Sequence, residues 1–580
     1  MHAKKINENW KFWKLKDSFA LFSTIPRSAE TVTLPHDEML CEASDEKSAN
    51  GGNTGYRDGD IYVYSRQLYV AKEDKEKTIM LKFEGVFMNA LVYINGQFAG
   101  KNPYGYSDFY VILNDFVHYG AQNEIRVQAR AGAMPNSRWY SGAGIYRDVY
   151  LYESGLIYIV PDGIQVRTKE ADRDYALLEI TTEIKNRMYI PGKYILETCI
   201  KNRDGTVVEQ TESLIELFGE EERTVLQRIL IEGTLLWTAD TPDLYYCETS
   251  ILEKESKRIL DQSRECFGIR TLQVDAKRGF RVNGSCVKLR GACIHHDSGL
   301  LGAATYEEAQ FRQIWKLKQA GFNAVRMSHH PMAPAMLRAC DSIGMYVMDE
   351  TFDMWNQCKT DYDYALYFQE WWERDVTSMV RKDYNHPSAI LYSVGNEIPE
   401  IGSGHGARVC HWISEKIKSL DTTRFTLASI NGLLAAGDDI VTVVKDITHG
   451  NIQELGNVNE FMTLQENYLD EIVTHDLIGE KLEKVCAATD IAGYNYMTAR
   501  YELDEKKYPQ RVIVGSETYP PEIQRNWKLV EKYPHLIGDF TWTGWDYIGE
   551  AGIGIPGYHT GEGDLEPYIR HNWHIAEILI

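Results

Sequence analysis

The chain has 580 residues, of which 44% are hydrophobic and 25% charged, and its formal net charge is −22 at pH 7. One hydrophobic core does not extend over this length, so we expect roughly three or four domains. The acidic balance, without a basic stripe, argues against nucleic acid as a partner, and the lack of a run of about 18 apolar residues argues against a membrane-spanning helix.

The N-terminus and the cysteines predict a cytoplasmic protein. The first ten residues hold no apolar stretch and no small-residue cleavage site, so we expect no signal peptide. The ten cysteines form no Cys-x-x-Cys pair, and this pattern indicates reduced thiols rather than disulfides or a zinc site.

Residues 1–156 are predicted to form a β-sandwich of the jelly-roll type. Residues 61–70 and 91–94 alternate with the period of two that strands need, and turn signals such as Asn95-Gly96 separate the short strands. Residues 157–273 continue with further strands, for example 163–167 and 176–180, and their length and spacing favour an immunoglobulin-like sandwich.

Residues 274–580 are predicted to form a catalytic (β/α)₈ barrel. Short, continuously apolar strands now alternate with amphipathic helices, as a buried parallel sheet requires. The expected strands cover residues 287–291, 323–328, 345–350, 389–394, 425–429, 491–495, 512–515 and 537–543, and the expected helices include 306–320, 334–343, 367–383 and 407–420.

Polar and aromatic side chains follow these strands at their C-terminal ends, where (β/α)₈ barrels carry their reacting groups. Carboxylates, histidines and aromatic rings on one rim fit sugar chemistry better than phosphate or hydride chemistry. The set comprises His295, His296, Asp297, Arg326, His329, His330, Asp349, Glu350, Asn396, Glu397, Asn495, Tyr496, Glu517, Trp545 and Asp546.

Two carboxylates of this set can flank one bond. Glu397 follows Gly395-Asn396 at the end of the fourth strand, and Glu517 follows Gly515-Ser516 at the end of the seventh. Retaining glycosidases place two carboxyl groups about 5–5.5 Å apart, one protonated as the acid and one ionised as the nucleophile. The alternative for either Glu is a salt bridge at a strand end.

The chain resembles the family 2 glycoside hydrolases, the group of β-galactosidases, β-glucuronidases and β-mannosidases. The similarity covers nearly the whole chain in the same domain order, so that motifs of modest individual weight become specific together. The matching stretches are 83–86 (FEGV), 92–96 (VYING), 139–149 (WYSGAGIYRDV), 288–291 (KLRG), 323–331 (NAVRMSHHP), 346–350 (YVMDE), 385–388 (NHPS), 395–397 (GNE), 515–517 (GSE) and 542–547 (WTGWDY).

The resemblance implies a role for the two carboxylates and their neighbour. Glu397 corresponds to the acid/base, Glu517 to the nucleophile, and Asn396 to the residue that hydrogen-bonds the sugar 2-hydroxyl. It also implies that His329 stabilises the transition state and that Tyr496 lies beside the nucleophile.

Further sugar contacts are expected around these residues. Trp545 corresponds to an aromatic floor under the sugar, and the alternative is that its ring only packs against the protein. The alternative for His329 is a histidine buried in the core with its hydrogen bonds satisfied. The alternative for Tyr496 is a residue that caps its strand. The remaining candidates for substrate binding are His295, His296, Asp297, Arg138 and Trp355, and the first three also fit a purely structural network.

The histidine doublets raise the question of a metal site. Adjacent residues on a strand point to opposite faces, so neither His295-His296 nor His329-His330 chelates well. We therefore expect no metal and no cofactor.

Two features bear on the sugar. Family β-glucuronidases read the substrate carboxylate with an Asn-x-Lys pair after the eighth strand, whereas Asn526-Trp527-Lys528 of this chain precedes that strand. A neutral hexose is therefore expected, with galactose first. Arg138 stands where relatives often carry an Asp that reaches into the site, and it could bind a hydroxyl or an acid group.

These observations predict a retaining exo-β-glycosidase that hydrolyses terminal non-reducing β-D-galactosides. Its partner is expected to be a small-molecule or oligosaccharide β-glycoside, with no membrane and no nucleic acid, and a homo-oligomer is left open. The alternatives are a β-glucuronidase or other family 2 β-glycosidase, and a non-catalytic carbohydrate-binding protein. After Gly552 the resemblance fades, so the last barrel helix is the part of the fold least defined by the sequence.

Overall fold

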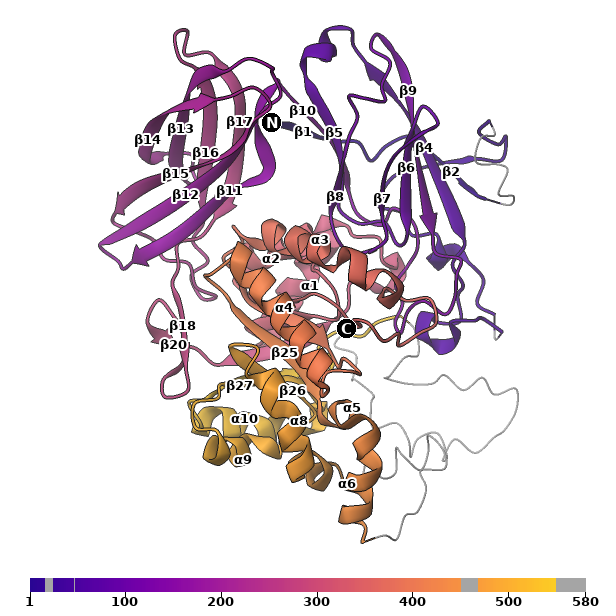
Figure 1. The fold of residues 1–580 in the computed structure, drawn as a ribbon, viewed down its shortest axis with the longest axis vertical. Helices are drawn as coiled ribbons and strands as arrows, with labels where there is room; N and C mark the ends of the chain where they lie inside the picture. The colour runs from indigo at the N-terminus through magenta and orange to yellow at the C-terminus, as the bar shows by residue number, and fades with distance from the viewer. Residues whose placement is uncertain (16–23, 46, 450–467, 549–580) are drawn as a thin grey trace.

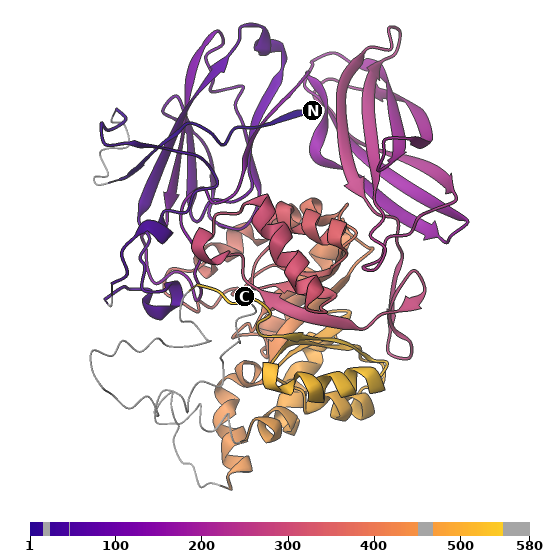
Figure 2. The same ribbon diagram turned by 180° about the vertical axis from the view of Figure 1, so that it is seen from behind.

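The computed structural model describes residues 1–15, 24–45, 47–449 and 468–548. Two β-sandwiches stand side by side over a barrel covered by helices (Figure 1), and the view from behind shows the same arrangement (Figure 2). The expected fold class, in which sheet domains precede a closed barrel, is confirmed. The weakly defined stretch after Gly552 lies outside the described residues.

The N-terminal sandwich contains a four-stranded sheet, ordered β1-β10-β5-β8, and a six-stranded sheet, ordered β3-β2-β4-β9-β6-β7. Asn95 and Gly96 connect β6 to β7 with φ of 51° and 79°, as a two-residue hairpin turn requires. The strands are β1 (His2–Lys5), β2 (Trp10–Lys14), β3 (Glu30–Val32), β4 (Ile61–Val70), β5 (Thr78–Phe83), β6 (Ala90–Ile94), β7 (Gln97–Asn102), β8 (Phe109–Ile112), β9 (Ala121–Arg130) and β10 (Val149–Ser154).

The second sandwich has sheets ordered β11-β12-β15 and β14-β13-β16-β17, which enclose one apolar core. A small sheet, β18-β19-β20, leads from it into the barrel. The strands are β11 (Ile157–Ala171), β12 (Tyr175–Asn186), β13 (Gly192–Asn202), β14 (Val207–Leu217), β15 (Glu222–Glu232), β16 (Tyr245–Glu253), β17 (Ile259–Phe267), β18 (Leu272–Asp275), β19 (Gly279–Val282) and β20 (Ser285–Cys286).

Parallel strands β21 to β28 close the barrel in chain order. Their residues are almost all buried, because helices cover the outside and side chains fill the inside. The strands are β21 (Leu289–Ile294), β22 (Ala324–Met327), β23 (Tyr346–Glu350), β24 (Ala389–Asn396), β25 (Phe425–Asn431), β26 (Ile491–Asn495), β27 (Ile513–Thr518) and β28 (Leu536–Thr541).

The helices around the barrel have local start and stop signals. Helix α2 has Pro334 in its first turn and ends at Gly344 with φ of 84°, while Ser403 caps α4 by accepting from the Gly406 N–H. The described helices are α1 (Glu307–Gln319), α2 (Pro334–Ile343), α3 (Ala365–Asp383), α4 (Gly404–Leu420), α5 (Gly432–Ala436), α6 (Ile440–Ile447), α8 (Asp476–Cys486), α9 (Arg500–Lys507) and α10 (Ile523–Lys532).

Loops of the N-terminal sandwich dock on the barrel beside its mouth. The Tyr104 hydroxyl donates to the Thr351 carbonyl at 2.6 Å, the Ser107 hydroxyl to Asp375 at 2.6 Å, and Arg147 to the Pro331 carbonyl at 3.2 Å. The sandwich can therefore contribute side chains to a site at this mouth. Among the described helices, none is long and apolar enough to cross a membrane.

Candidate active site

The ends of neighbouring strands place the two predicted carboxylates at one level of the barrel. Asn396, the last residue of β24, pairs in register with Ser429 of β25, and Asn495, the last residue of β26, pairs with Glu517 of β27. Glu397 follows Asn396 with φ of 44°, and its N–H donates to the Ser429 carbonyl at 2.8 Å. Glu397 and Glu517 therefore leave the barrel wall at the same mouth.

Arg326 of β22 lies at the centre of the site and has no exposed surface. Its guanidinium donates to both oxygens of Glu350 at 2.8 and 2.7 Å, to Glu517 Oε1 at 2.8 Å and to Asn396 Oδ1 at 2.9 Å. Burial opposes its charge, but Glu350 and Glu517 raise the pKa of Arg326 above its ordinary value. One permanent cation thus holds groups from three other strands.

Glu350 orients His329 toward the predicted nucleophile. His329 Nδ1 lies 2.8 Å from Glu350 Oε1, and His329 Nε2 lies 3.6 Å from Glu517 Oε1. Burial alone would raise the pKa of Glu350, but Arg326 and His329 outweigh it and hold that pKa below its ordinary value. Glu350 is therefore an ionised anchor in the barrel interior.

Glu517 is only 3% exposed, and burial raises its pKa above the ordinary value. Arg326 opposes this rise, and the negative charge of Glu397 adds to it. The Tyr496 hydroxyl is hydrogen-bonded to Glu517, and burial together with Glu517 and Glu397 raises the pKa of Tyr496 far above 10, so the hydroxyl is the donor. Glu397 and Glu517 both raise the pKa of Tyr496, so the two carboxylates lie close enough to share one electrostatic environment.

Glu397 is more open to solvent than Glu517. Its side chain is half-buried, and Asn431 Nδ2 at the end of β25 donates to Glu397 Oε1 at 2.9 Å. The two carboxylates thus differ in burial and in their donors, and such a difference can separate an acid from a nucleophile.

A further buried carboxylate, Asp353, lies in the loop after β23. It accepts hydrogen bonds from Arg138 at 2.7 and 2.9 Å, from Lys359 Nζ at 2.8 Å and from Asn396 Nδ2 at 2.9 Å. Arg138 comes from the N-terminal sandwich, so both domains build this side of the mouth. Direct contact between Arg138 and a sugar stays a prediction, since the guanidinium is already paired.

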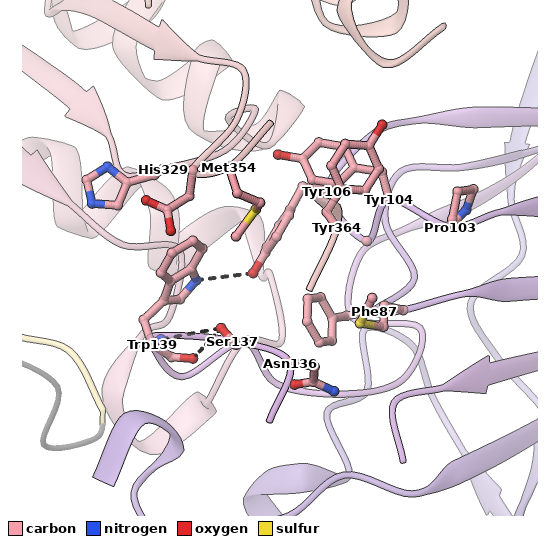
Figure 3. Close-up of a pocket in the computed structure, with 13 residues that line it drawn as sticks. Phe87, Pro103, Tyr104, Tyr106, Asn136, Ser137, Trp139, His329, Met354 and Tyr364 are labelled. Atoms are coloured by element: carbon pink, nitrogen blue, oxygen red, sulfur yellow. Dashed lines mark hydrogen bonds between the residues drawn. The ribbon is translucent and has the colours of Figure 1, made fainter. Parts of the chain in front are cut away.

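Aromatic rings lie beside Asp353 at the mouth. Trp139 follows Arg138, donates from its indole N–H to the Tyr106 hydroxyl at 3.1 Å, and places its ring 5.7 Å from that of His329 (Figure 3). Together with Tyr104, Tyr364 and other side chains it encloses a cavity of about 30 Å³. That volume holds about one water molecule, so a sugar ring has to lie outside it.

The contacts of Trp545 give no support to its predicted role as the aromatic floor, which stays a prediction. Trp545 lies among the apolar side chains between β21, α1 and α2, with Arg312 of α1 over its ring at 5.9 Å. Trp542, three residues earlier, is instead stacked on His329 at 5.2 Å and edge-on to His295 at 5.3 Å. Trp542 therefore lies against two histidines of the site, a contact that is not found for Trp545 among the described residues.

Trp355 and His296 also take packing positions. Trp355 has no exposed surface and donates to the Val394 carbonyl at 3.1 Å. His296 contacts the Ser141 carbonyl at 3.1 Å and His330 at 3.0 Å, at the boundary with the N-terminal sandwich. In both cases the partners are protein atoms behind the mouth, so these positions give no support to a sugar contact.

Asp297 and His295 have different surroundings: Asp297 is paired with the backbone, whereas one ring nitrogen of His295 is left without a partner among the described residues. Asp297 accepts from the Ile548 N–H at 2.9 Å, and burial raises its pKa to about 7, so it anchors the segment after β28. His295 lies between Trp139, Trp542 and Tyr547, and its Nδ1 has no partner among the described residues. A sugar contact of His295 stays a prediction.

Sequence reasoning assigned no role to five residues that form the site. Arg326 and Trp542 stood inside quoted motifs, and a signal existed for Arg326, because a cation amid so many strand-end acids is expected to pair with them. Asp353, Lys359 and Asn431 lie in or beside loops where no periodicity marks them. Within the described ranges, no group of three or more His, Cys, Asp or Glu side chains could hold a metal ion.

Comparisons with known proteins place this geometry in context. The family description "Glycosyl hydrolases family 2, TIM barrel domain" matches residues 273–504, and "Glycosyl hydrolases family 2" matches residues 157–270. A solved family 2 glycosyl hydrolase from Bacteroides cellulosilyticus is 33% identical, with a TM-score of 0.81 over 95% of this chain and 68% of that one.

Curated relatives differ in their named sugar. A β-galactosidase of Bacteroides ovatus, BoGH2A, is 31% identical over 90% of this chain and 64% of its own length. A putative β-glucuronidase of Formosa agariphila is 30% identical over 95% of this chain and 53% of its own. The chain thus spans between half and two thirds of the length of these two relatives.

Proposed function

The chain belongs to glycoside hydrolase family 2, and from this premise we propose that it is a retaining exo-β-glycosidase for terminal non-reducing β-D-galactosides. The observation that carries the proposal is the shared mouth of Glu397 and Glu517, where the charge of one raises the pKa of the other. Because the relatives are longer than this chain, the activity and substrate of the whole protein belong to the proposal.

The reaction proceeds by two displacements. The Glu517 carboxylate attacks the anomeric carbon while the bond to the glycosidic oxygen breaks, and Glu397 gives its proton to that oxygen. Glu397 then takes a proton from a water molecule whose oxygen attacks the same carbon, and the ester bond to Glu517 breaks. Two inversions retain the β configuration.

The surroundings of each carboxylate support this division of roles. Arg326 and the Tyr496 hydroxyl donate to Glu517 and oppose, without cancelling, the rise of its pKa on burial, and donors of this kind stabilise the ionised form that a nucleophile needs. Glu397 is half-buried beside Asn431, where solvent water can reach it for the second step. His329, 3.6 Å from Glu517, lies where positive charge develops on the sugar ring.

Galactose is proposed first because the sequence has no Asn-x-Lys pair after the eighth strand, where the family's β-glucuronidases carry it. Asn526 and Lys528 lie on α10 outside the barrel, and Asn526 is fully buried against Asp539. The second candidate, a β-glucuronidase, is favoured by one observation: Arg138 and Lys359 bring two cations to the mouth, although both are paired with Asp353.

A panel of aryl β-glycosides with galactose, glucose, glucuronic acid and mannose tests the proposal. We expect the highest kcat/KM with the galactoside, and a loss of activity of at least about 10⁴-fold in Glu517→Gln. Glu179→Gln, a nearly buried carboxylate in the second sandwich, serves as the matched control and should retain wild-type activity.

A mechanism-based inhibitor tests the covalent step. A 2-deoxy-2-fluoro aryl glycoside slows the second displacement and should leave a sugar attached to the peptide that contains Glu517, detected by mass spectrometry. A label on any other residue contradicts the assignment. Binding of glycosides without turnover would instead support the non-catalytic alternative.

A further inference from the structure

Arg138 connects the N-terminal sandwich to the reaction site through one carboxylate. It lies in the loop between β9 and β10, and its Nε and Nη2 donate to the two oxygens of Asp353 at 2.9 and 2.7 Å. A two-point contact of this kind fixes the plane of the carboxylate as well as its position. Burial would raise the pKa of Asp353, but Arg138 and Lys359 hold it far below its ordinary value, so Asp353 is ionised.

Asp353 in turn determines which way the Asn396 amide faces. Asn396 Nδ2 donates to Asp353 Oδ1 at 2.9 Å, and Asn396 Oδ1 accepts from Arg326 at 2.9 Å and from Asn495 at 3.1 Å. A reversed amide would turn its oxygen toward a carboxylate and its NH₂ toward a guanidinium. These contacts use one of the two N–H groups of Asn396 and leave the second for a substrate.

We propose that Arg138 is a positioning residue: by fixing Asp353 it orients the Asn396 amide so that its second N–H donates to the sugar hydroxyl next to the anomeric carbon. This inference rests on the proposed function, which gives Asn396 its sugar partner. It makes the N-terminal sandwich a working part of the reaction site. It also replaces the direct sugar contact that the sequence position of Arg138 predicts.

Lys359 supports the same carboxylate from the barrel side without duplicating Arg138. Its Nζ donates to Asp353 Oδ1 at 2.8 Å and to the Asn396 carbonyl at 3.0 Å. Lys359 therefore contacts only one of the two carboxylate oxygens. Without Arg138, Asp353 Oδ2 loses its hydrogen bond, and only the contacts of Lys359 and Asn396 with Oδ1 still hold the carboxylate, so its plane is no longer fixed at two points.

The test compares two substrates that differ in one hydroxyl. For wild type, Arg138→Gln, Arg138→Lys and Asn396→Ala, kcat/KM is measured with the best aryl glycoside of the panel and with its 2-deoxy analogue. Arg381→Gln is the matched control, because Arg381 also forms an ion pair between domains, with Glu183, and is 28% exposed at its side chain against 34% for Arg138.

The value to compare is kcat/KM for the aryl glycoside divided by kcat/KM for its 2-deoxy analogue. We expect this ratio to fall at least about tenfold in Asn396→Ala and in Arg138→Gln, as the loss of one hydrogen bond to the 2-hydroxyl in the transition state predicts. Arg138→Lys, which keeps the charge, should fall less, and Arg381→Gln should keep the wild-type ratio. Equal losses on both substrates in Arg138→Gln would mean a merely structural role and would overturn the inference.

Failure of the proposed function is recognised separately. If wild type hydrolyses no glycoside of the panel, that proposal fails, and a crystal structure of Arg138→Gln decides the positioning inference. If the distance from Asn396 Nδ2 to the nearer Asp353 oxygen exceeds hydrogen-bond range in this variant, the positioning inference is supported. An unchanged Asp353 and Asn396 overturn it.

Discussion

Replacing Arg326 by Met removes the cation that lies between Glu350 and Glu517 in the barrel interior. Met preserves the approximate length of the side chain but donates no hydrogen bond. Glu350, with no exposed surface, loses three hydrogen bonds, while Glu517 and Asn396 lose one each. The substitution therefore leaves buried charge without its partner, which costs far more than the pair itself contributes.

The expected loss of stability is about 3–5 kcal/mol, the usual cost of breaking a buried ion pair on one side. For a domain of this size roughly 2 °C of Tm corresponds to 1 kcal/mol, so the barrel transition should fall by about 6–10 °C. Arg326→Met/Glu350→Gln removes both charges and should recover more than half of that loss.

The loss should also depend on pH. In the wild type Arg326 holds the pKa of Glu350 below its ordinary value. Without Arg326, burial raises that pKa above the value of about 4.3 in the unfolded chain, and a carboxyl with a raised folded pKa destabilises the fold as pH rises above its unfolded pKa. Scanning calorimetry should therefore give a larger Tm difference at pH 7.5 than at pH 5.5. A difference that does not vary with pH, or a double variant no more stable than Arg326→Met, would refute this reasoning.

Two further predictions concern residues near the mouth. Trp542→Ala should raise KM for the aryl glycoside at least about fivefold, because one stacking surface is worth about 1 kcal/mol or more. Trp545→Ala should instead lower Tm and keep KM within about twofold. The reverse order would support the original choice of Trp545. Asp297 has a folded pKa of about 7, above its unfolded value of about 3.9, so it lowers stability as pH rises from 4 to 7. Asp297→Asn should therefore reduce the fall of Tm over this range, and an unchanged slope would show that Asp297 does not titrate as described.

Most of the fold could be predicted because periodicity is a local property of the sequence. The strand 491–495 and the helix 334–343 have the predicted bounds, and 61–70 is strand β4. Several predicted barrel strands stop short of the observed ends: β24 continues to Asn396 and β27 to Thr518. Polar residues at these ends interrupt the apolar pattern, although barrel hydrogen bonds continue through them.

The site was less predictable because side-chain direction depends on tertiary structure. Trp542 and Trp545 lie three residues apart in one motif, and only the turn after β28 decides which of them faces His329. Asp353 gave no signal in the sequence, since its partners lie 215 residues before it and 43 residues after it. Loops that bring distant segments together escape any argument from local spacing.

The N-terminal sandwich supplies contacts to Asp353 that the barrel itself does not provide among the described residues. The strand ends supply the two carboxylates, Glu397 and Glu517, and the cation Arg326 that contacts Glu517. From the barrel side, the only cation that contacts Asp353 among the described residues is Lys359, and it reaches one of the two oxygens. The loop between β9 and β10 adds Arg138 to the other oxygen and Trp139 beside His329. Because a reaction of this kind depends on groups held to within a fraction of an ångström, a docked sandwich that fixes Asp353 contributes to the chemistry although it carries neither carboxylate.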